Sequence, residues 1–265
     1  MIDLDILRKS DYILCFGQFL ANTNEQIVEA INEAKKSNNA EVIYMHAVDS
    51  LALKDFYTQF IKYEAGSEEG ISSLLLDTFV KNTSEKVQAY IDDLDIGYIS
   101  AESSAGEEEF EEAFEKSLGK TNKTILVGED IFSHKRVDNI LKILSAIEKY
   151  SDLKLLSSMP IDTQDENIEE VEELLPFNGT VVYSYLDSSK DSNIVYASAS
   201  FSRIAKVEDK ANIKLTSNEG EVLKKLIVDD TLQSTIAICA TNKKGSDFLS
   251  CGYIYKPVKI ERLEE

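Results

Sequence analysis

The sequence predicts an α/β protein: a Rossmann-like parallel sheet built from two β-loop-α-β units, with a smaller mixed, mainly β C-terminal part. Two apolar runs of strand length each end at a glycine, and each is followed by an amphipathic helix and a second apolar run. Beyond about residue 176, β-branched and aromatic runs alternate with turn residues. A chain of 265 residues can bury the core of one large domain or of two small ones.

The first unit begins with the apolar run Tyr12–Phe16, which is typical of a buried parallel strand and ends at Gly17. Thr23 and Gln26 have the spacing of a capping box, so we expect a helix to begin at Thr23. The next strand is Glu41–Met45. The helix between them carries one apolar stripe, formed by Ile27, Val28, Ala30, Ile31 and Ala34.

The second unit repeats this order. Thr124–Val127 is a strand that ends at Gly128, Ser133 is the expected N-cap of a helix, and Leu153–Leu156 is the following strand. The apolar face of that helix consists of Val137, Ile140, Leu141, Leu144 and Ile147. Because such crossovers are right-handed, the two units predict one parallel sheet or two facing ones.

Further helices and a strand lie between the two units. A strand is expected at Phe60–Tyr63, a helix after Gly66, and another helix over Lys86–Leu94. Residues 102–118 predict an amphipathic helix with an acidic outer face, whose inward positions are Phe110, Ala113, Phe114 and Leu118.

The C-terminal part predicts several strands and one helix. The helix is expected at Glu219–Val228, capped by Ser217 or Asn218. A boundary near Pro176 divides the chain into an α/β domain, 1–176, and a mixed subdomain, 177–265. Strands are expected at Thr180–Tyr185, Ile194–Ala197, Ile213–Thr216, Thr235–Cys239 and Tyr253–Tyr255.

The charge of the chain restricts its partners. With 28 Lys and Arg against 48 Asp and Glu, the formal net charge is −20. This charge opposes binding to nucleic-acid phosphates and to anionic membrane surfaces, and it favours basic partners or serves solubility alone. No apolar run approaches the ~20 residues of a bilayer span, and the acidic N-terminus is unlike a signal peptide. We therefore expect a cytoplasmic protein without direct membrane insertion.

Metal and catalytic motifs are absent from the sequence. Cys15 lies in an apolar run, and Cys239 and Cys251 form no CxxC pair, so neither a metal nor an iron–sulfur site is expected. His46 and Asp49 follow a strand, where α/β active sites usually lie, but no matching nucleophile and no GxSxG elbow is visible. No catalytic residue is predicted.

The two strand-ending glycines allow a phosphate-binding interpretation, but they favour a simpler one. Neither Gly17 nor Gly128 has the GxGxxG spacing, and Glu129 and Asp130 would repel an anion at the second position. Turn glycines are the favoured interpretation of both. His134, beside Lys135 and Arg136 near a helix start, is expected to be a surface histidine without a role.

The order of these segments resembles a known family. Ile13–Gly17, Val42–Tyr44, Phe60–Gly70 and Thr124–Pro160 look like the central α/β region of molybdopterin-dependent oxidoreductases. The similarity is greatest to the large G subunit of NADH–quinone oxidoreductase, respiratory complex I, which keeps this fold without needing the cofactor. It covers roughly residues 10–160. The resemblance implies vestigial cofactor-binding positions at Gly17, Gln18, Thr23 and Gly66.

The chain also departs from that family. Gln18 stands where the family has an asparagine, and His46 to Asp49 replace an acidic-Pro-Arg segment. The cysteine region for iron–sulfur clusters and the molybdenum ligand are missing. The resemblance therefore implies a non-catalytic accessory or substitute subunit, without cofactor, that docks to other subunits or to an electron carrier. Glu108, Glu111 and Glu115 are the candidate docking residues. A protein that binds a nucleotide or other anion, and an acidic interaction module, are the alternatives.

Overall fold

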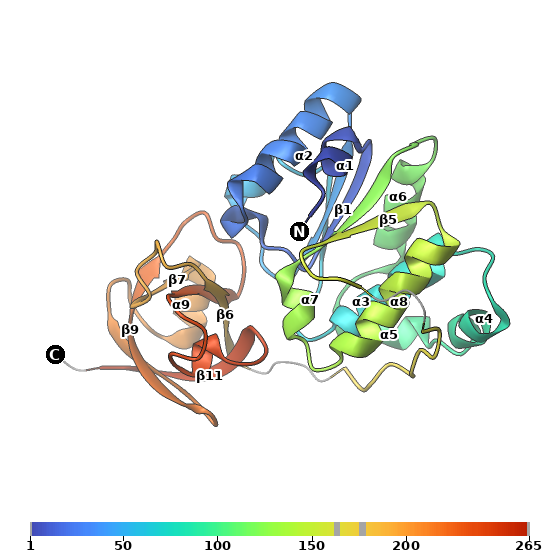
Figure 1. Ribbon diagram of the computed structural model, residues 1–265. Coiled ribbons are helices and arrows are strands. Elements are labelled where there is room, and N and C mark those ends of the chain that lie inside the picture. Colours follow the sequence, from blue (N-terminus) through green and yellow to red (C-terminus); the bar gives the residue numbers. More distant parts are fainter. Residues whose placement is uncertain (1, 162–164, 175–178, 264–265) are drawn as a thin grey trace. The chain divides into compact units, whose positions relative to one another are not determined.

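The computed structural model describes residues 2–161, 165–174 and 179–263, which form two compact units (Figure 1). The first unit comprises residues 1–46 and 53–175, and the second comprises 47–52 and 176–265. The boundary predicted near Pro176 falls among residues 175–178, outside the described residues. The short segment 47–52, far from the C-terminal part in sequence, thus belongs to the second unit.

Five parallel strands form the sheet of the first unit in the order β3-β2-β1-β4-β5. Both predicted β-loop-α-β units contribute to this one sheet, so the predicted Rossmann-like α/β fold is confirmed and the alternative of two facing sheets is wrong. The chain order reverses between the neighbours β1 and β4. The strands are β1 (Tyr12–Phe16), β2 (Glu41–His46), β3 (Gln59–Lys62), β4 (Lys123–Val127) and β5 (Leu153–Ser157).

Helices cover both faces of this sheet (Figure 1). Ile13 and Cys15 of β1 pack with α1 and α2, whereas Tyr12 points to the other face and donates its hydroxyl to the Ala113 carbonyl at 2.6 Å. Burial on both faces explains the continuous apolar strand sequences. The helices are α1 (Leu4–Lys9), α2 (Glu25–Asn38), α3 (Glu68–Phe79), α4 (Glu85–Asp92), α5 (Ile96–Ser103), α6 (Glu107–Ser117), α7 (Glu129–Ser133) and α8 (Val137–Tyr150).

Several predicted helix ends are wrong. Asn24, not Thr23, caps α2, because its side chain accepts the Gln26 N–H at 2.9 Å. Ser133 ends the short helix α7 and does not begin α8. The acidic helix is interrupted at Ser104, which is left-handed at φ 54°, so α5 and α6 are separate. Leu118, expected to point inward, is 61% exposed, because α6 ends at Ser117 and Leu118 follows it in an extended conformation.

Six strands of the second unit form a closed barrel in the order β10-β6-β11-β8-β9-β7. The pairs β10–β6 and β7–β9 are parallel, and the others are antiparallel. Fully buried side chains such as Val195, Phe201 and Leu226 belong to its core. The elements are β6 (Thr180–Leu186), β7 (Ile194–Ala197), α9 (Ala199–Ala205), β8 (Asn212–Ser217), β9 (Gly220–Val228), β10 (Ile236–Thr241), the 3-10 turn Phe248–Ser250 and β11 (Tyr255–Arg262).

The helix predicted at Glu219–Val228 is wrong, since this segment is strand β9. Ser217 pairs with Gly220 across a tight turn, and Gly220 adopts φ +151°, so the turn folds β8 and β9 into a hairpin. The residues of β9 then alternate, with Lys224 and Leu226 buried and Leu223 and Lys225 exposed. The short apolar run of this segment is compatible with a helix and with a strand. Pairing with β8 in the hairpin makes it a strand.

Candidate functional site

The candidate site is the carboxyl edge of the parallel sheet where β1 and β4 lie side by side. In open α/β sheets, ligands bind in the crevice at this topological switch point. Here the two loops contact each other directly: the Gly128 N–H donates to the Phe16 carbonyl at 2.8 Å, and the Asp130 N–H donates to the Gly17 carbonyl at 3.2 Å. A Cβ atom at Gly128 would lie only 1.9 Å from the Gly17 oxygen. Backbone therefore closes the crevice at this point.

Gly17 has a structural reason to be glycine. It adopts φ +64°, a left-handed conformation that side chains disfavour, and its N–H donates to the Met45 carbonyl at 3.3 Å. Gln18 follows it and is half-buried. This geometry agrees with the turn-glycine interpretation.

The helix starts near this edge already use N–H groups that could bind an anion. At the start of α2, the Gln26 N–H is taken by Asn24, and at the start of α7, the Asp130 N–H is taken by Gly17. Thr23 lies just before Asn24 and is partly buried. An anion here would have to displace these intramolecular acceptors.

Gly66 lies in another loop at the same edge, after β3. It adopts φ +91°, and its carbonyl oxygen lies 3.3 Å from Nε2 of His134. The sheet order separates this loop from the loop carrying Gly17, Gln18 and Thr23 by one strand, β2. The structure thus places the four predicted cofactor positions at one sheet edge but in two different loops.

Both histidines of the chain lie at this edge, each beside a buried carboxylate. His46 ends β2, and its Nε2 lies 2.9 Å from Oδ2 of Asp130 in α7, with both side chains buried. His134 follows α7, and its Nε2 lies 3.7 Å from Oε2 of Glu68, the first residue of α3. Sequence reasoning missed both pairs, because the partners are 84 and 66 residues apart and no motif connects them.

The prediction of a surface position for His134 is wrong. The helix α7 ends at Ser133, which turns the next residue toward Gly66, and His134 is only 5% exposed. Burial lowers the pKa of His134 below its ordinary value, against the opposing effect of the Gly66 carbonyl. The imidazole is therefore held in its neutral form over a wider pH range than an exposed histidine.

Aromatic rings surround the His46 side chain. Its ring stacks on Phe19 at 5.3 Å and on Tyr44 at 5.7 Å, measured between centroids. Tyr63 lies nearby, fully buried, and its hydroxyl finds no hydrogen-bond partner among the described residues. Burial, with the charges of Glu68 and Asp130 adding to it, raises the pKa of Tyr63 well above its usual value.

A histidine held by a carboxylate is the arrangement that orients a general base. In this structure, however, His46 is completely buried and Phe19 is 2% exposed. The pair therefore has a structural role. It links the end of β2 to α7 and so holds in place the loop that closes the crevice. A reaction at His46 would first require the two loops to separate.

The predicted docking residues lie on the outer face of α6. Glu108, Glu111 and Glu115 are exposed, whereas Phe110 and Ala113 on the opposite face are buried. The spacing of three and four residues puts the three carboxylates on one side of the helix. Asp49, considered beside His46 in the sequence, belongs to the second unit, where its carbonyl accepts the Gln233 N–H at 3.2 Å.

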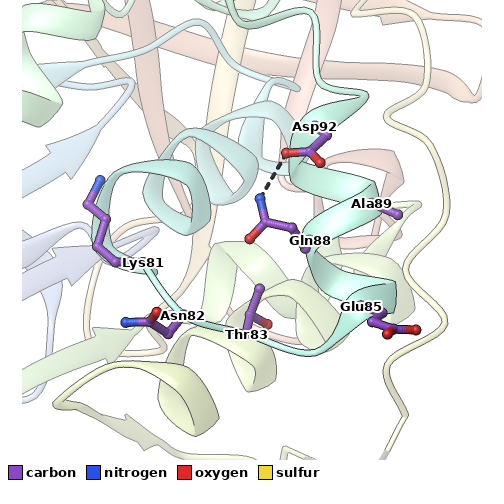
Figure 2. A pocket seen from close by; sticks show the side chains of 7 residues that line it. All are labelled: Lys81, Asn82, Thr83, Glu85, Gln88, Ala89 and Asp92. Carbon is purple, nitrogen blue, oxygen red and sulfur yellow. Dashed lines mark hydrogen bonds between the residues drawn. The ribbon is translucent and has the colours of Figure 1, made fainter.

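An open surface hollow of about 450 Å³ lies beside α4 (Figure 2). Figure 2 shows that Gln88 and Asp92 are hydrogen-bonded along one of its walls, at 2.8 Å. Its lining combines one lysine with carboxylates and amides, and it contains no buried reactive group. The hollow therefore has the character of a general polar surface. The lining residues are Lys81, Asn82, Thr83, Glu85, Gln88, Ala89 and Asp92.

The three cysteines are unpaired: Cys15 and Cys239 are buried and Cys251 is exposed. Within the described part of the chain, no group of three or more His, Cys, Asp or Glu side chains is arranged to hold a metal ion. No helix among the described residues has the length and apolar character of a bilayer span. Comparison of the sequence with models of known families and with curated proteins gives no match.

Proposed function

We propose that the chain is a non-catalytic subunit of an NADH–quinone oxidoreductase-like respiratory complex, in which it provides scaffold and docking surface. One observation carries the proposal: the sheet has the strand order of a nucleotide-binding fold, yet backbone contact between Gly17 and Gly128 closes its ligand crevice. A fold that keeps the scaffold and closes the ligand site fits a protein that serves an assembly. The resemblance of residues 10–160 to the complex I subunit is the reason for proposing a respiratory complex as that assembly.

The acidic face of α6 is the docking surface in this proposal. Glu108, Glu111 and Glu115 form an exposed stripe on a chain of net charge −20, which complements a basic partner subunit or electron carrier. Association through such a surface is steered by charge and weakens as salt rises.

The proposal is tested by isolating the protein from its own cells under mild detergent at low salt. A tagged copy expressed from its natural locus is captured, separated on a native gel and analysed for accompanying proteins. We expect it to migrate with subunits of a NADH–quinone oxidoreductase. Migration as a free protein, with no respiratory subunit attached, would contradict the proposal.

The docking surface is tested by the triple substitution Glu108→Lys, Glu111→Lys and Glu115→Lys. We expect this variant to lose the accompanying subunits, because three attractive charges become repulsive. The matched control carries the same change of charge on another acidic helix, with Glu25→Lys, Glu29→Lys and Glu33→Lys on α2. Equal loss in both variants would show that net charge, and not the α6 face, decides association.

The anion-binding alternative is tested by thermal denaturation with a panel of nucleotides. A ligand at 100 times its dissociation constant adds about 2.7 kcal/mol to the free energy of unfolding. We expect no such shift, because Gly17 and Asn24 already accept the N–H groups that an anion would need. A stabilising nucleotide would favour the alternative over the scaffold role.

A further inference from the structure

An extended acidic segment, residues 165–174, is bound along the surface of α8 and α3, and we name it the strap. It has no helix or strand. Six of its ten residues are acidic: Asp165, Glu166, Glu169, Glu170, Glu172 and Glu173.

Lysines on α8 and in the turn before it pair with acids of the strap. Lys142 and Lys149 are seven residues apart on one side of α8, and Lys135 lies in the turn just before the helix. Lys142 pairs with Asp165 at 3.1 Å, Lys135 pairs with Glu172 at 2.7 Å, and Lys149 pairs with Glu166. Each lysine therefore holds a different acid of the strap.

The lengths of the two elements agree. A helix rises 1.5 Å per residue, so Lys142 and the N-cap Arg136 are separated by about 9 Å along the axis of α8. An extended chain covers at most about 3.3–3.6 Å per residue, so Asn167 and Glu170, whose carbonyls these two side chains bind, can span about 10–11 Å. The strap thus runs antiparallel to α8 and almost fully extended, and its backbone bonds follow this order from Lys142 through Asn139 to Arg136.

Side chains of the groove also recognise the strap's backbone. The Asn139 amide donates to the Glu169 carbonyl at 2.9 Å, and its oxygen accepts the Glu169 N–H at 2.7 Å. Arg136 donates to the Glu170 carbonyl at 3.1 Å, and Lys142 donates to the Asn167 carbonyl at 3.0 Å. The paired bonds of Asn139 imitate those of a neighbouring β-strand and do not depend on the side chain at residue 169.

A buried carboxylate orients these groove side chains. Glu69 of α3 is 1% exposed, and its Oε1 accepts from Arg136 Nε at 3.0 Å and from Asn139 Nδ2 at 2.7 Å. Its other oxygen accepts the Glu172 N–H of the strap at 3.2 Å. The groove is therefore a preorganised set of donors and acceptors, not a chance crossing of surface charges.

The far end of the strap has an apolar anchor. Leu174 is only 7% exposed, and its N–H donates to the Tyr98 hydroxyl at 3.2 Å. Gly70 of α3 makes the space, since a Cβ there would lie 3.0 Å from the Leu174 side chain and 2.9 Å from that of Ile99. The groove thus contacts the acidic side chains, the backbone and one aliphatic side chain of the strap.

We propose that this face of α8 and α3 is a binding groove for an extended acidic peptide with an aliphatic anchor. The strap is its intramolecular occupant, and a partner protein that carries a segment of the same chemistry replaces it. Charge complementarity with Lys135, Lys142 and Lys149 identifies that partner segment as acidic. The backbone bonds made by the groove side chains identify it as extended. This groove is distinct from the α6 docking face and independent of the respiratory role.

The test uses the full chain with Glu166→Gln, Glu169→Gln and Glu172→Gln, which weakens the strap without shortening it. A fluorescent peptide with the sequence of residues 165–174 is titrated, and binding is followed by anisotropy. We expect the variant to bind at least about tenfold more tightly than the natural chain, whose groove is occupied in cis at high effective concentration. Adding Asn139→Ala to the variant should abolish binding.

Two controls make the outcome decisive. A scrambled peptide of equal composition should bind at least about tenfold more weakly than the native peptide, because the register is lost. In the natural chain, saturating native peptide should increase hydrogen exchange of the strap amides. Equal binding by both peptides, or unchanged strap protection at saturation, overturns the proposal even if the triple variant does not fold.

Discussion

At the residue scale, Asp130 connects three parts of the sheet edge. Its N–H donates to the Gly17 carbonyl, and its carboxylate lies 2.9 Å from the His46 ring. Both side chains of the pair are buried, so the loss of one removes a buried polar contact of the other. The pair therefore matters more to stability than an exposed ion pair of the same length would.

We expect Asp130→Ala to lower the free energy of unfolding by about 2–4 kcal/mol, because it removes a buried polar contact of the His46 ring. Urea denaturation followed by circular dichroism measures the change. The control is Glu129→Ala, which removes the neighbouring exposed acid and should change stability by about 0.5 kcal/mol or less. Similar losses in both variants would argue against a structural role for the pair.

Gly128 and Gly17 differ in why they must be glycine. Gly128 has φ −84°, which any residue can adopt, but a Cβ there meets the Gly17 backbone oxygen at 1.9 Å. At Gly17 the left-handed φ is the main obstacle, and the nearest atoms belong to the movable Ile131 side chain at 2.8 Å. Backbone crowding at Gly128 is the harder constraint.

We expect Gly128→Ala to destabilise the chain by about 3 kcal/mol through overpacking and Gly17→Ala by about 1–2 kcal/mol through left-handed strain. Denaturation of both variants by urea gives the comparison. A smaller loss for Gly128→Ala than for Gly17→Ala would mean that the loops after β1 and β4 are not in contact in solution. That result would also remove the main support for a closed crevice.

At the element scale, the strap depends on ionised carboxylates. Lys149, Tyr150 and Ser84 lower the pKa of Glu166 from 4.5 to about 2 by hydrogen bonding. The pKa of Glu172 is lowered by Lys135, and that of Asp165 by the Asn167 N–H and by Lys142. Because binding lowers the pKa of these carboxyl groups, it is stabilised at pH values above their ordinary pKa. This stabilisation is lost as the pH falls toward the lowered pKa.

We expect the strap to leave α8 between about pH 4.5 and about pH 2, while it stays bound at neutral pH. Hydrogen exchange of residues 165–174 at each pH, with a correction for intrinsic rates, measures the release. In the Glu166→Gln variant the part of the transition nearest pH 2 should disappear. Strap protection that does not change over this range would show that its ion pairs do not hold it.

At the scale of the whole molecule, each of the two compact units buries apolar side chains of its own among the described residues. One group lies between the helices and the five-stranded sheet, and the other fills the six-stranded barrel, where Phe201 is completely buried. Each unit buries its own apolar side chains, as independently folding domains do. The segment 47–52 crosses from one unit to the other and returns: the Leu51 N–H donates to the Thr231 carbonyl at 2.7 Å.

We expect two unfolding transitions in calorimetry, one for each unit. Phe201→Ala should lower the temperature of one transition only, since it costs about 3–5 kcal/mol within the barrel core. Asp130→Ala should lower the other. A single transition that both variants shift equally would show that the two units unfold together.

Elements with a local signal could be predicted from the order of the amino acids. The continuous apolar runs at Tyr12–Phe16 and Thr124–Val127 predicted buried parallel strands, and Gly17 predicted a turn, because burial on two faces and a left-handed residue leave direct traces in composition. The outer position of Glu108, Glu111 and Glu115 followed from helical periodicity in the same way.

Tertiary structure alone decided the features that depend on contacts between distant segments. The segment Glu219–Val228 became strand β9 because β8 was available to pair with it. His134 is buried because α7 ends one residue before it, and His46 meets Asp130 across 84 residues. The closure at Gly17 and Gly128 and the register of the strap on α8 have the same cause: distant chain segments meet there, and no local pattern encodes such a contact.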